Sequence, residues 1–305
     1  MKNLLKDDRY KVFFAILCAT GWSLAYPFIK IGYQGFGIKG NDLGGKILFA
    51  GIRFFIAGIL VSFICIFKGK KLNIKNKKDY GWLILLALVN TTLHYMFAYI
   101  GLGNNSSGRS TILDSLGGFF LIALSTLFFK DDKMTLRKAL GSGLGVLGIV
   151  IINIDFSGHF FDNITFAGDG MILLNALCAG FGGIITRIVS RKMNILAATG
   201  HSMTIGGACL IATGMVIGKK NPWNNNFTNI LVLILLILIS AVCFAIYNAL
   251  LKYHPISEIA IYNALIPVLG VIFATLFLGE SLRWQYFIAV ILVAFGIRIV
   301  NGKNR

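Results

Sequence analysis

Charged residues are scarce in this chain of 305 residues: only 13% of the positions are Asp, Glu, Lys or Arg, whereas 56% are hydrophobic. Average soluble domains carry about 25% charged residues, and a soluble fold of this size could not hide so much apolar surface. Proline is also scarce, with 4 residues, but 35 glycines are present, and glycine is commoner in transmembrane helices than in soluble ones. The composition therefore excludes an ordinary soluble domain and favours an all-α integral membrane protein in a lipid bilayer.

Acidic residues are the scarcer of the two charge types, because 12 Asp and Glu stand against 29 Lys and Arg, a net charge of +17. A basic chain can bind nucleic acid when its charges form a patch on one domain. Here the basic residues lie mainly in short gaps between apolar runs. This pattern indicates membrane orientation, and no nucleic-acid partner is expected.

Motifs for enzyme chemistry are missing as well. The five cysteines lie inside apolar runs without a Cys-x-x-Cys pair, which argues against a zinc or redox site. The sequence contains no His-x-x-Glu-His, no Gly-x-Ser-x-Gly and no complete phosphate loop ending in Ser or Thr, so ATP hydrolysis by this chain is not expected. We predict a protein that is not an enzyme and needs no metal or cofactor.

Long apolar runs are the dominant feature of the sequence. A membrane-spanning helix needs about 20 apolar residues at 1.5 Å each, and reading the chain on this basis predicts ten spans joined by short connections. They cover residues 11–34, 46–67, 80–102, 108–129, 136–153, 168–190, 195–217, 228–251, 256–278 and 284–300.

Lys and Arg are distributed very unequally between the connections of these spans. If the ten spans cross the membrane one after another, 21 Lys and Arg lie on the same side as the N-terminus and 6 lie on the other side. Basic residues collect on the cytoplasmic side of membrane proteins. We therefore predict that both termini are cytoplasmic and that the protein is a multi-pass protein of the cell membrane.

The two halves of the chain resemble each other. Gly148–Asn153 reads Gly-Ile-Val-Ile-Ile-Asn and recurs as Gly-Ile-Arg-Ile-Val-Asn at Gly296–Asn301, and at the same offset Asp132 aligns with Glu280. We predict two five-helix repeats, residues 1–153 and 154–305. An odd number of helices in each repeat makes the two insert with opposite orientation, an arrangement typical of transporters that hold their substrate near the membrane midplane.

Several motifs together resemble the EamA-type drug/metabolite transporters. The first span carries Gly21-Trp22-Ser23, the second carries Arg53-Phe54-Phe55, and Phe277-Leu278-Gly279-Glu280 precedes the last span. The first half has Lys130-Asp131-Asp132 where the family usually has Gly-Glu. The resemblance covers essentially the whole chain and implies ten helices in two repeats around a central cavity, with the fifth and tenth helices at the periphery.

Polar and aromatic residues inside the spans are candidates to line such a cavity. Trp22, Tyr26 and Lys30 share one face of the first span, and Asn90, His94 and Phe97 share a face of the third. Amphipathic aromatics and amides suit a site for small polar solutes with apolar parts, although single polar residues also serve as contacts between helices. The predicted substrate-cavity residues are Trp22, Tyr26, Asn90, His94, Tyr247, Asn248 and Asn263.

Three charged residues lie at similar depth inside the spans. Lys30, Arg53 and Asp114 are each about 6 to 10 Å from the outer ends of their helices at 1.5 Å per residue. A charge inside a span costs about 2.5–3.5 kcal/mol or more, so we predict an intramembrane charge network in which Asp114 pairs with Lys30 or Arg53. The same residues could instead form a substrate or gate site near the outer mouth.

The sequence as a whole predicts a secondary transporter of small metabolites, such as amino acids, that works by alternating access and exports its substrate. An intramembrane lipid-modifying enzyme and an uptake carrier for another small solute are the alternatives. A channel is disfavoured because a single chain shows no ring or filter. The identity of the substrate, the coupling ion and the choice between monomer and homodimer stay open.

Overall fold

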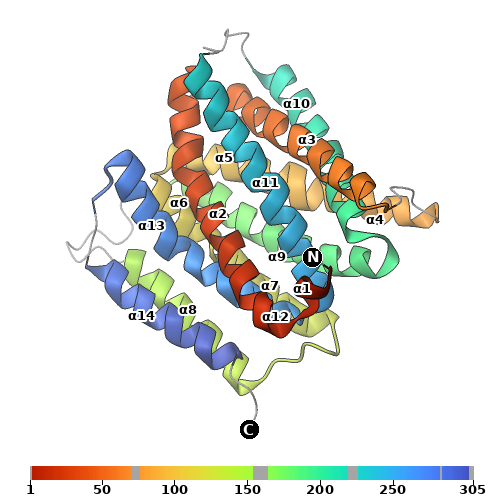
Figure 1. The fold of residues 1–305 in the computed structure, drawn as a ribbon. Helices are drawn as coiled ribbons and strands as arrows, with labels where there is room; N and C mark the ends of the chain where they lie inside the picture. Colours follow the sequence, from red (N-terminus) through yellow and green to blue (C-terminus); the bar gives the residue numbers. More distant parts are fainter. Residues whose placement is uncertain (1, 71–75, 154–163, 219–225, 282–283, 302–305) are drawn as a thin grey trace.

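The computed structural model of the chain describes residues 2–70, 76–153, 164–218, 226–281 and 284–301. Every regular element within these ranges is helical (Figure 1). The long elements are α2 (Asp8–Phe36), α3 (Leu43–Phe67), α8 (Leu136–Asn153), α9 (Met171–Lys192), α10 (Ile195–Ile217), α11 (Phe227–Tyr253) and α14 (Gln285–Asn301). Three further membrane-spanning stretches, which we call rods, each consist of consecutive short helices. Their bounds are given with the candidate functional site below.

Eight helical stretches in the described part of the chain are long and apolar enough to cross a membrane. They match eight of the ten predicted spans, and two of them, Ile195–Ile217 and Ile256–Leu278, have the predicted bounds. The other six are Asp8–Phe36, Leu43–Phe67, Asp79–Asn104, Ser107–Phe128, Phe166–Lys192 and Phe227–Tyr253. The remaining predicted spans, 136–153 and 284–300, form helices α8 and α14 but are not among these eight.

Helices α3 and α10 form the most extensive helix pair, and glycines allow their close approach. A Cβ on Gly207 would lie 2.7 Å from the Cα atom of Phe55, and one on Gly58 would lie 2.8 Å from the carbonyl oxygen of Gly200. Small residues bring transmembrane helix backbones together, so that van der Waals packing and weak polar contacts hold the pair. Arg53, on α3, also lines the cavity described below.

Helices α8 and α14 pack chiefly against each other at one edge of the molecule (Figure 1). Gly141 and Gly296 face each other at the crossing, because a Cβ on Gly141 would meet the carbonyl oxygen of Gly296 at 2.7 Å. This arrangement agrees with the peripheral fifth and tenth helices that the family resemblance implies. The lining of the central cavity comes from the other helices.

The contacts of the helix ends define two opposite ends of the bundle. We call one the basic end, which contains Lys11, Asp131, Asp132, Arg187, His254, Ser257 and Glu258, and the other the opposite end, which contains Lys30, Asn105, Ser107, Arg109, Asp169 and Glu280. Helix α2 runs from the basic end to the opposite end, and α9 runs the other way. The first helices of the two halves are therefore antiparallel.

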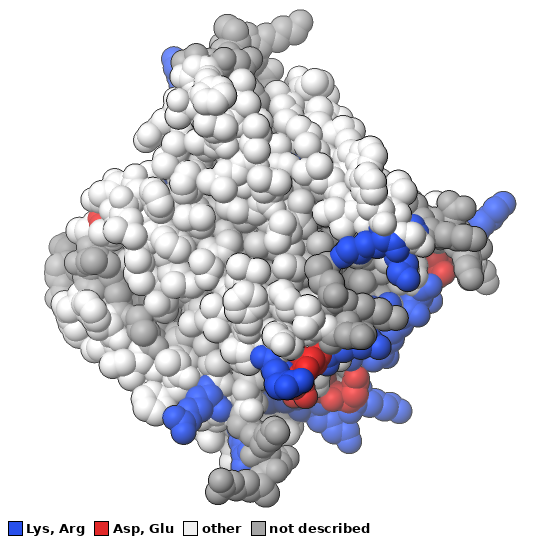
Figure 2. Space-filling view, viewed as in Figure 1, with Lys and Arg blue, Asp and Glu red and all other residues white. Residues whose placement is uncertain are grey.

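Charged side chains are gathered at one end of the visible surface. Lys and Arg cluster beside the N-terminus and near the start of α4 (Lys78–Ala87), whereas the broad face across α2, α11 and α13 (Leu265–Leu278) is almost free of charge (Figure 2). Large hydrophobic side chains such as Phe13, Phe63 and Leu238 are exposed. Exposed apolar side chains of this kind are stable in contact with lipid rather than water.

Candidate functional site

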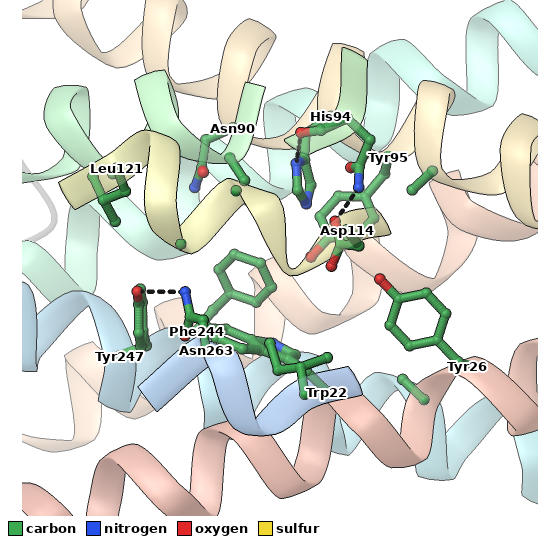
Figure 3. Close-up of a pocket in the computed structure, with 18 of the residues that line it drawn as sticks. Trp22, Tyr26, Asn90, His94, Tyr95, Asp114, Leu121, Phe244, Tyr247 and Asn263 are labelled. Carbon is green, nitrogen blue, oxygen red and sulfur yellow. Dashed lines mark hydrogen bonds between the residues drawn. The ribbon is translucent and has the colours of Figure 1, made fainter. Parts of the chain in front are cut away.

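A central cavity lies among the spans of both halves. Its lining combines aromatic rings, amides, one arginine and one acid. Figure 3 labels several of the rings, two of the amides and the acid, Asp114. The polar and aromatic lining residues are Trp22, Tyr26, Arg53, Asn90, His94, Tyr95, Tyr99, Asp114, Asn175, Thr186, Phe244, Tyr247, Asn248 and Asn263.

All seven residues predicted for a substrate cavity lie on this one surface. Figure 3 shows Asn90, His94 and Asp114 on one side of the open space and Trp22, Tyr247 and Asn263 on the other. The Trp22 ring packs edge-on against Tyr247, with 4.8 Å between the ring centroids, and Asn263 donates a hydrogen bond of 3.0 Å to the Tyr247 hydroxyl. Whether these residues touch a substrate stays a prediction.

The rod that carries Asn90 and His94 contains a π-helical segment. Its pieces are α4, the π-helix η1 (Leu88–Leu93) and α5 (His94–Asn104). A π-helical turn inserts one extra residue and re-aims the side chains beside it, and such turns are frequent at functional sites. The Nδ1 atom of His94 lies 3.1 Å from the carbonyl oxygen of Asn175. Because a carbonyl only accepts, Nδ1 carries a proton and the other ring nitrogen is an acceptor when the ring is neutral.

The rod of the fourth span is interrupted at the cavity. Helix α6 (Ser107–Asp114) ends at Asp114, and α7 (Leu116–Phe128) begins two residues later. Gly117 and Gly118 follow the interruption, where glycine weakens helix propensity and leaves room for α9 and Asn263 to approach. The break leaves the side chain of Asp114 at the cavity wall.

The rod of the ninth span is interrupted in a similar place. Helix α12 (Ile256–Ala260) passes into the 3-10 helix η3 (Ile261–Ala264) before α13 begins. Pro267 has no N–H to donate to the carbonyl of Asn263, four residues earlier, which weakens regular helix there. Interrupted helices near the membrane midplane form binding sites in many transporters.

The three predicted intramembrane charges are not paired with one another. Lys30 donates to the carbonyl of Asn105, and Asp114 accepts from the amide of Asn175. Arg53 donates from Nε to Ser240 Oγ at 2.7 Å and from Nη1 to the Tyr99 hydroxyl at 2.8 Å. Arg53 and Asp114 line the cavity, but Lys30 does not. The structure thus differs from the predicted ion pair, because shared depth does not place side chains on facing helix surfaces.

Three polar atoms at the lining have no hydrogen-bond partner within the described ranges. They are the Trp22 Nε1 donor, the Asn175 Oδ1 acceptor and the Thr186 Oγ1 atom. A buried polar group without a partner costs about 1–3 kcal/mol. Because all three belong to the cavity, a bound polar solute or water could satisfy them.

The cavity contains functional candidates that the sequence reading missed. Asn175, Tyr95 and Phe244 contribute to the lining, and the Tyr95 ring lies 6.0 Å from that of Phe244. Asn175 had a visible signal, since it is an isolated amide within the predicted span 168–190. Phe244 had none, because a phenylalanine in an apolar run is equally expected to face lipid.

Known proteins with similar sequences include several that are named as transporters. An uncharacterized transporter, sll0355 of Synechocystis, is 26% identical over 94% of this chain and 91% of its own length. The S-adenosylmethionine/S-adenosylhomocysteine transporter of Chlamydia muridarum is 22% identical over 96% and 92%. A solved crystal structure aligns with a TM-score of 0.74 over 94% of this chain and 96% of the other at 13% identity, which shows a shared fold.

These findings define the class of the protein as a multi-pass helical membrane protein. The EamA-like transporter family model matches the chain twice, over residues 9–154 and 166–302. The chain belongs to the EamA-like transporter family.

Proposed function

We propose that this protein is a secondary transporter of small metabolites, such as amino acids, and exports them across the plasma membrane. The observation that carries the proposal is the central cavity, whose aromatic and amide lining suits solutes with both polar and apolar parts. One relative is named for the transport of two organic metabolites, which favours a metabolite as cargo here. Lys and Arg are gathered at the end of the molecule where the N-terminus lies, which supports a cytoplasmic location of the termini.

The transport cycle that we propose is alternating access between two inverted repeats, residues 1–153 and 154–305, with α8 and α14 as the fifth and tenth spans. Its support is the antiparallel course of α2 and α9 and the interruption of a helix beside the cavity in each half. Similar halves in opposite orientations can exchange their conformations, which opens the cavity to one side at a time.

A ligand screen tests the binding step. The purified protein in detergent is heated with single amino acids and common metabolites, and we expect at least one to raise the unfolding temperature, because a ligand that binds only the folded state stabilises it. Trp22→Ala and Asn90→Ala should lose this shift while the ligand-free protein unfolds at nearly the same temperature. An unchanged ligand shift in both variants would place the binding site elsewhere.

A further inference from the structure

The surroundings of Asp114 indicate more than a structural acid. The carboxylate faces the cavity at the interruption between α6 and α7, where it accepts a hydrogen bond from the side-chain amide of Asn175 and interacts with the Tyr26 hydroxyl (Figure 3). Both partners are neutral donors. No Lys or Arg forms an ion pair with Asp114 among the described residues, which leaves its charge without a counter-charge in direct contact.

The other charge on the lining has a separate set of partners. The Nε atom of Arg53 donates to Ser240 and to the carbonyl of Leu236, and Nη1 donates to Tyr99. The guanidinium also lies 5.0 Å from the centre of the Phe54 ring. Arg53 is 2% exposed, so these contacts hold it in the wall between α3 and α11, and Asp114 is the acid that the cavity presents to a solute.

Aromatic rings line the cavity on both sides of the space that Asp114 faces (Figure 3). Tyr95 lies edge-on to His94, with 4.3 Å between their centroids, and the Trp22 and Phe244 rings are 5.7 Å apart. Aromatic faces attract cations, most strongly where water is excluded. A carboxylate that shares a cavity with such rings can bind a protonated amine with an apolar body.

We propose that Asp114 binds the protonated amino group of the transported solute, while Trp22, Tyr95 and Phe244 contact the apolar part of that solute. The inference rests on the proposed transport function and narrows its substrate class to organic amines. Asn175 and Tyr26 are positioning residues, because their donors orient the carboxylate toward the cavity.

The test uses three probes of nearly equal size: 2-phenylethylamine, 2-phenylethanol and phenylacetate. Binding to the purified protein is measured by calorimetry at neutral pH. We expect the amine to bind about tenfold more tightly than the alcohol, the effect of one charge-assisted hydrogen bond, and phenylacetate to bind most weakly. Asp114→Asn, which preserves shape and removes the charge, should abolish the preference.

A second variant distinguishes the loss of the Asp114 charge from misfolding of the Asp114→Asn protein. Asn263 lies on the cavity at the interruption of the ninth span, so the double change Asp114→Asn with Asn263→Asp moves the acid across the cavity. The double variant should regain part of the amine preference. Equal binding of amine and alcohol to the unmodified protein, tighter binding of phenylacetate, or an amine preference that survives Asp114→Asn would overturn the proposal. Counterflow of a neutral or anionic solute in proteoliposomes would in that case leave the proposed function intact.

An independent observation concerns the two acids that the repeat alignment pairs, Asp132 and Glu280. Asp132 follows α7 at the basic end, where it accepts from the backbone N–H of Ser257 at 2.9 Å and from its hydroxyl at 2.5 Å. Glu280 follows α13 at the opposite end, where its two oxygens accept from the N–H groups of Ser107 and Gly108, each at 3.1 Å. Each acid therefore caps the first turn of the interrupted rod in the other half.

The two caps connect the interrupted rod α6–α7 with the interrupted rod α12–η3–α13, one cap at each end of the bundle. The start of α12 has no side-chain cap of its own, because Pro255 precedes it, and Asp132 supplies the missing acceptor. Burial raises the pKa of Asp132, but the hydrogen bonds from Lys138 and Ser257 outweigh burial and hold the pKa below its ordinary value. The carboxylate is therefore ionised at neutral pH and accepts both Ser257 bonds.

We infer that the contacts of Asp132 with Ser257 and of Glu280 with Ser107 and Gly108, which we call latches, keep the cavity closed at the two ends of the bundle. The latch at one end must break before the cavity becomes accessible from that end. The test labels a single cysteine, introduced as Asn90→Cys into a protein without native cysteines, with an impermeant reagent from either side of the membrane. Asn76→Cys and Asn41→Cys, exposed in connections at the two ends, serve as references for sidedness.

Asp132→Asn should speed labelling from the Asn76 side at least about threefold, and Glu280→Gln should do so from the Asn41 side. Asp131→Asn is the matched control, because Asp131 belongs to the same connection but bonds Arg187 instead of Ser257. It should leave labelling from both sides unchanged. If both latch variants change labelling from the same side, or only reduce the amount of folded protein, the two acids are structural caps and the inference is wrong.

Discussion

Gly207→Leu is expected to prevent the close pairing of α3 and α10 and to remove most of the folded protein. Even the first atom of a new side chain would lie 2.7 Å from the Cα atom of Phe55 and 3.0 Å from the carbonyl oxygen of Gly51. Both obstacles are backbone atoms, so the helices must separate rather than rearrange a side chain. Overpacking costs about 1–3 kcal/mol where neighbours can adjust, and here we expect a larger loss.

The matched control for this change is Gly143→Leu on α8. Gly143 is exposed, and a Cβ there would meet no atom within 4 Å. Leucine has a higher helix propensity than glycine, so this variant should unfold at the same temperature as the parent or slightly above it. The measurement is the fraction of monodisperse protein that survives heating in detergent. Equal survival of both variants would show that the α3–α10 contact does not limit stability.

Arg53→Leu is expected to lower the free energy of unfolding by about 3 kcal/mol. The change removes hydrogen bonds to the Leu236 carbonyl, to Ser240 and to Tyr99, and each bond to a charged group contributes about 1.5–3 kcal/mol. The gain from no longer burying a charge offsets part of this sum. The loss should therefore be smaller than the three bonds added together.

Arg53→Lys separates the role of charge from that of geometry. Lysine keeps the charge but cannot reach Ser240 and Tyr99 with a rigid fork of donors, so the variant should lie between the parent and Arg53→Leu. Denaturation of the purified protein by increasing SDS measures the difference. A lysine variant as stable as the parent would mean that charge alone matters at this position, and a stable leucine variant would mean that the bonds contribute nothing.

The membrane spans could be predicted closely because their signal is local. Apolar length alone set the bounds of 195–217 and 256–278 as the structure has them. The lining residues were also predictable in part, since Trp22, Asn90 and His94 are polar or amphipathic residues within apolar runs. Their assembly into one cavity then follows from the packing of the two halves.

The pairing of charges could not be predicted in the same way. Depth along a helix follows from residue number, but the direction of a side chain depends on helix rotation, and an interruption such as the one after Asp114 changes that rotation. Asp114 consequently meets Asn175 rather than Lys30 or Arg53. The aligned acids Asp132 and Glu280 were visible as a repeat, yet their caps on Ser257 and Ser107 are contacts across more than 120 residues of chain.

The central claim, that the cavity carries a small solute across the membrane, is tested most directly by counterflow in proteoliposomes. Vesicles that contain the protein are loaded with an unlabelled solute from the ligand screen and diluted into a trace of the labelled form. A carrier should accumulate label transiently above equilibrium, and Trp22→Ala and Asn90→Ala, inserted in equal amounts, should reduce this overshoot severalfold. Label that never exceeds equilibrium for any solute that binds, or an overshoot untouched by both cavity variants, would contradict the account.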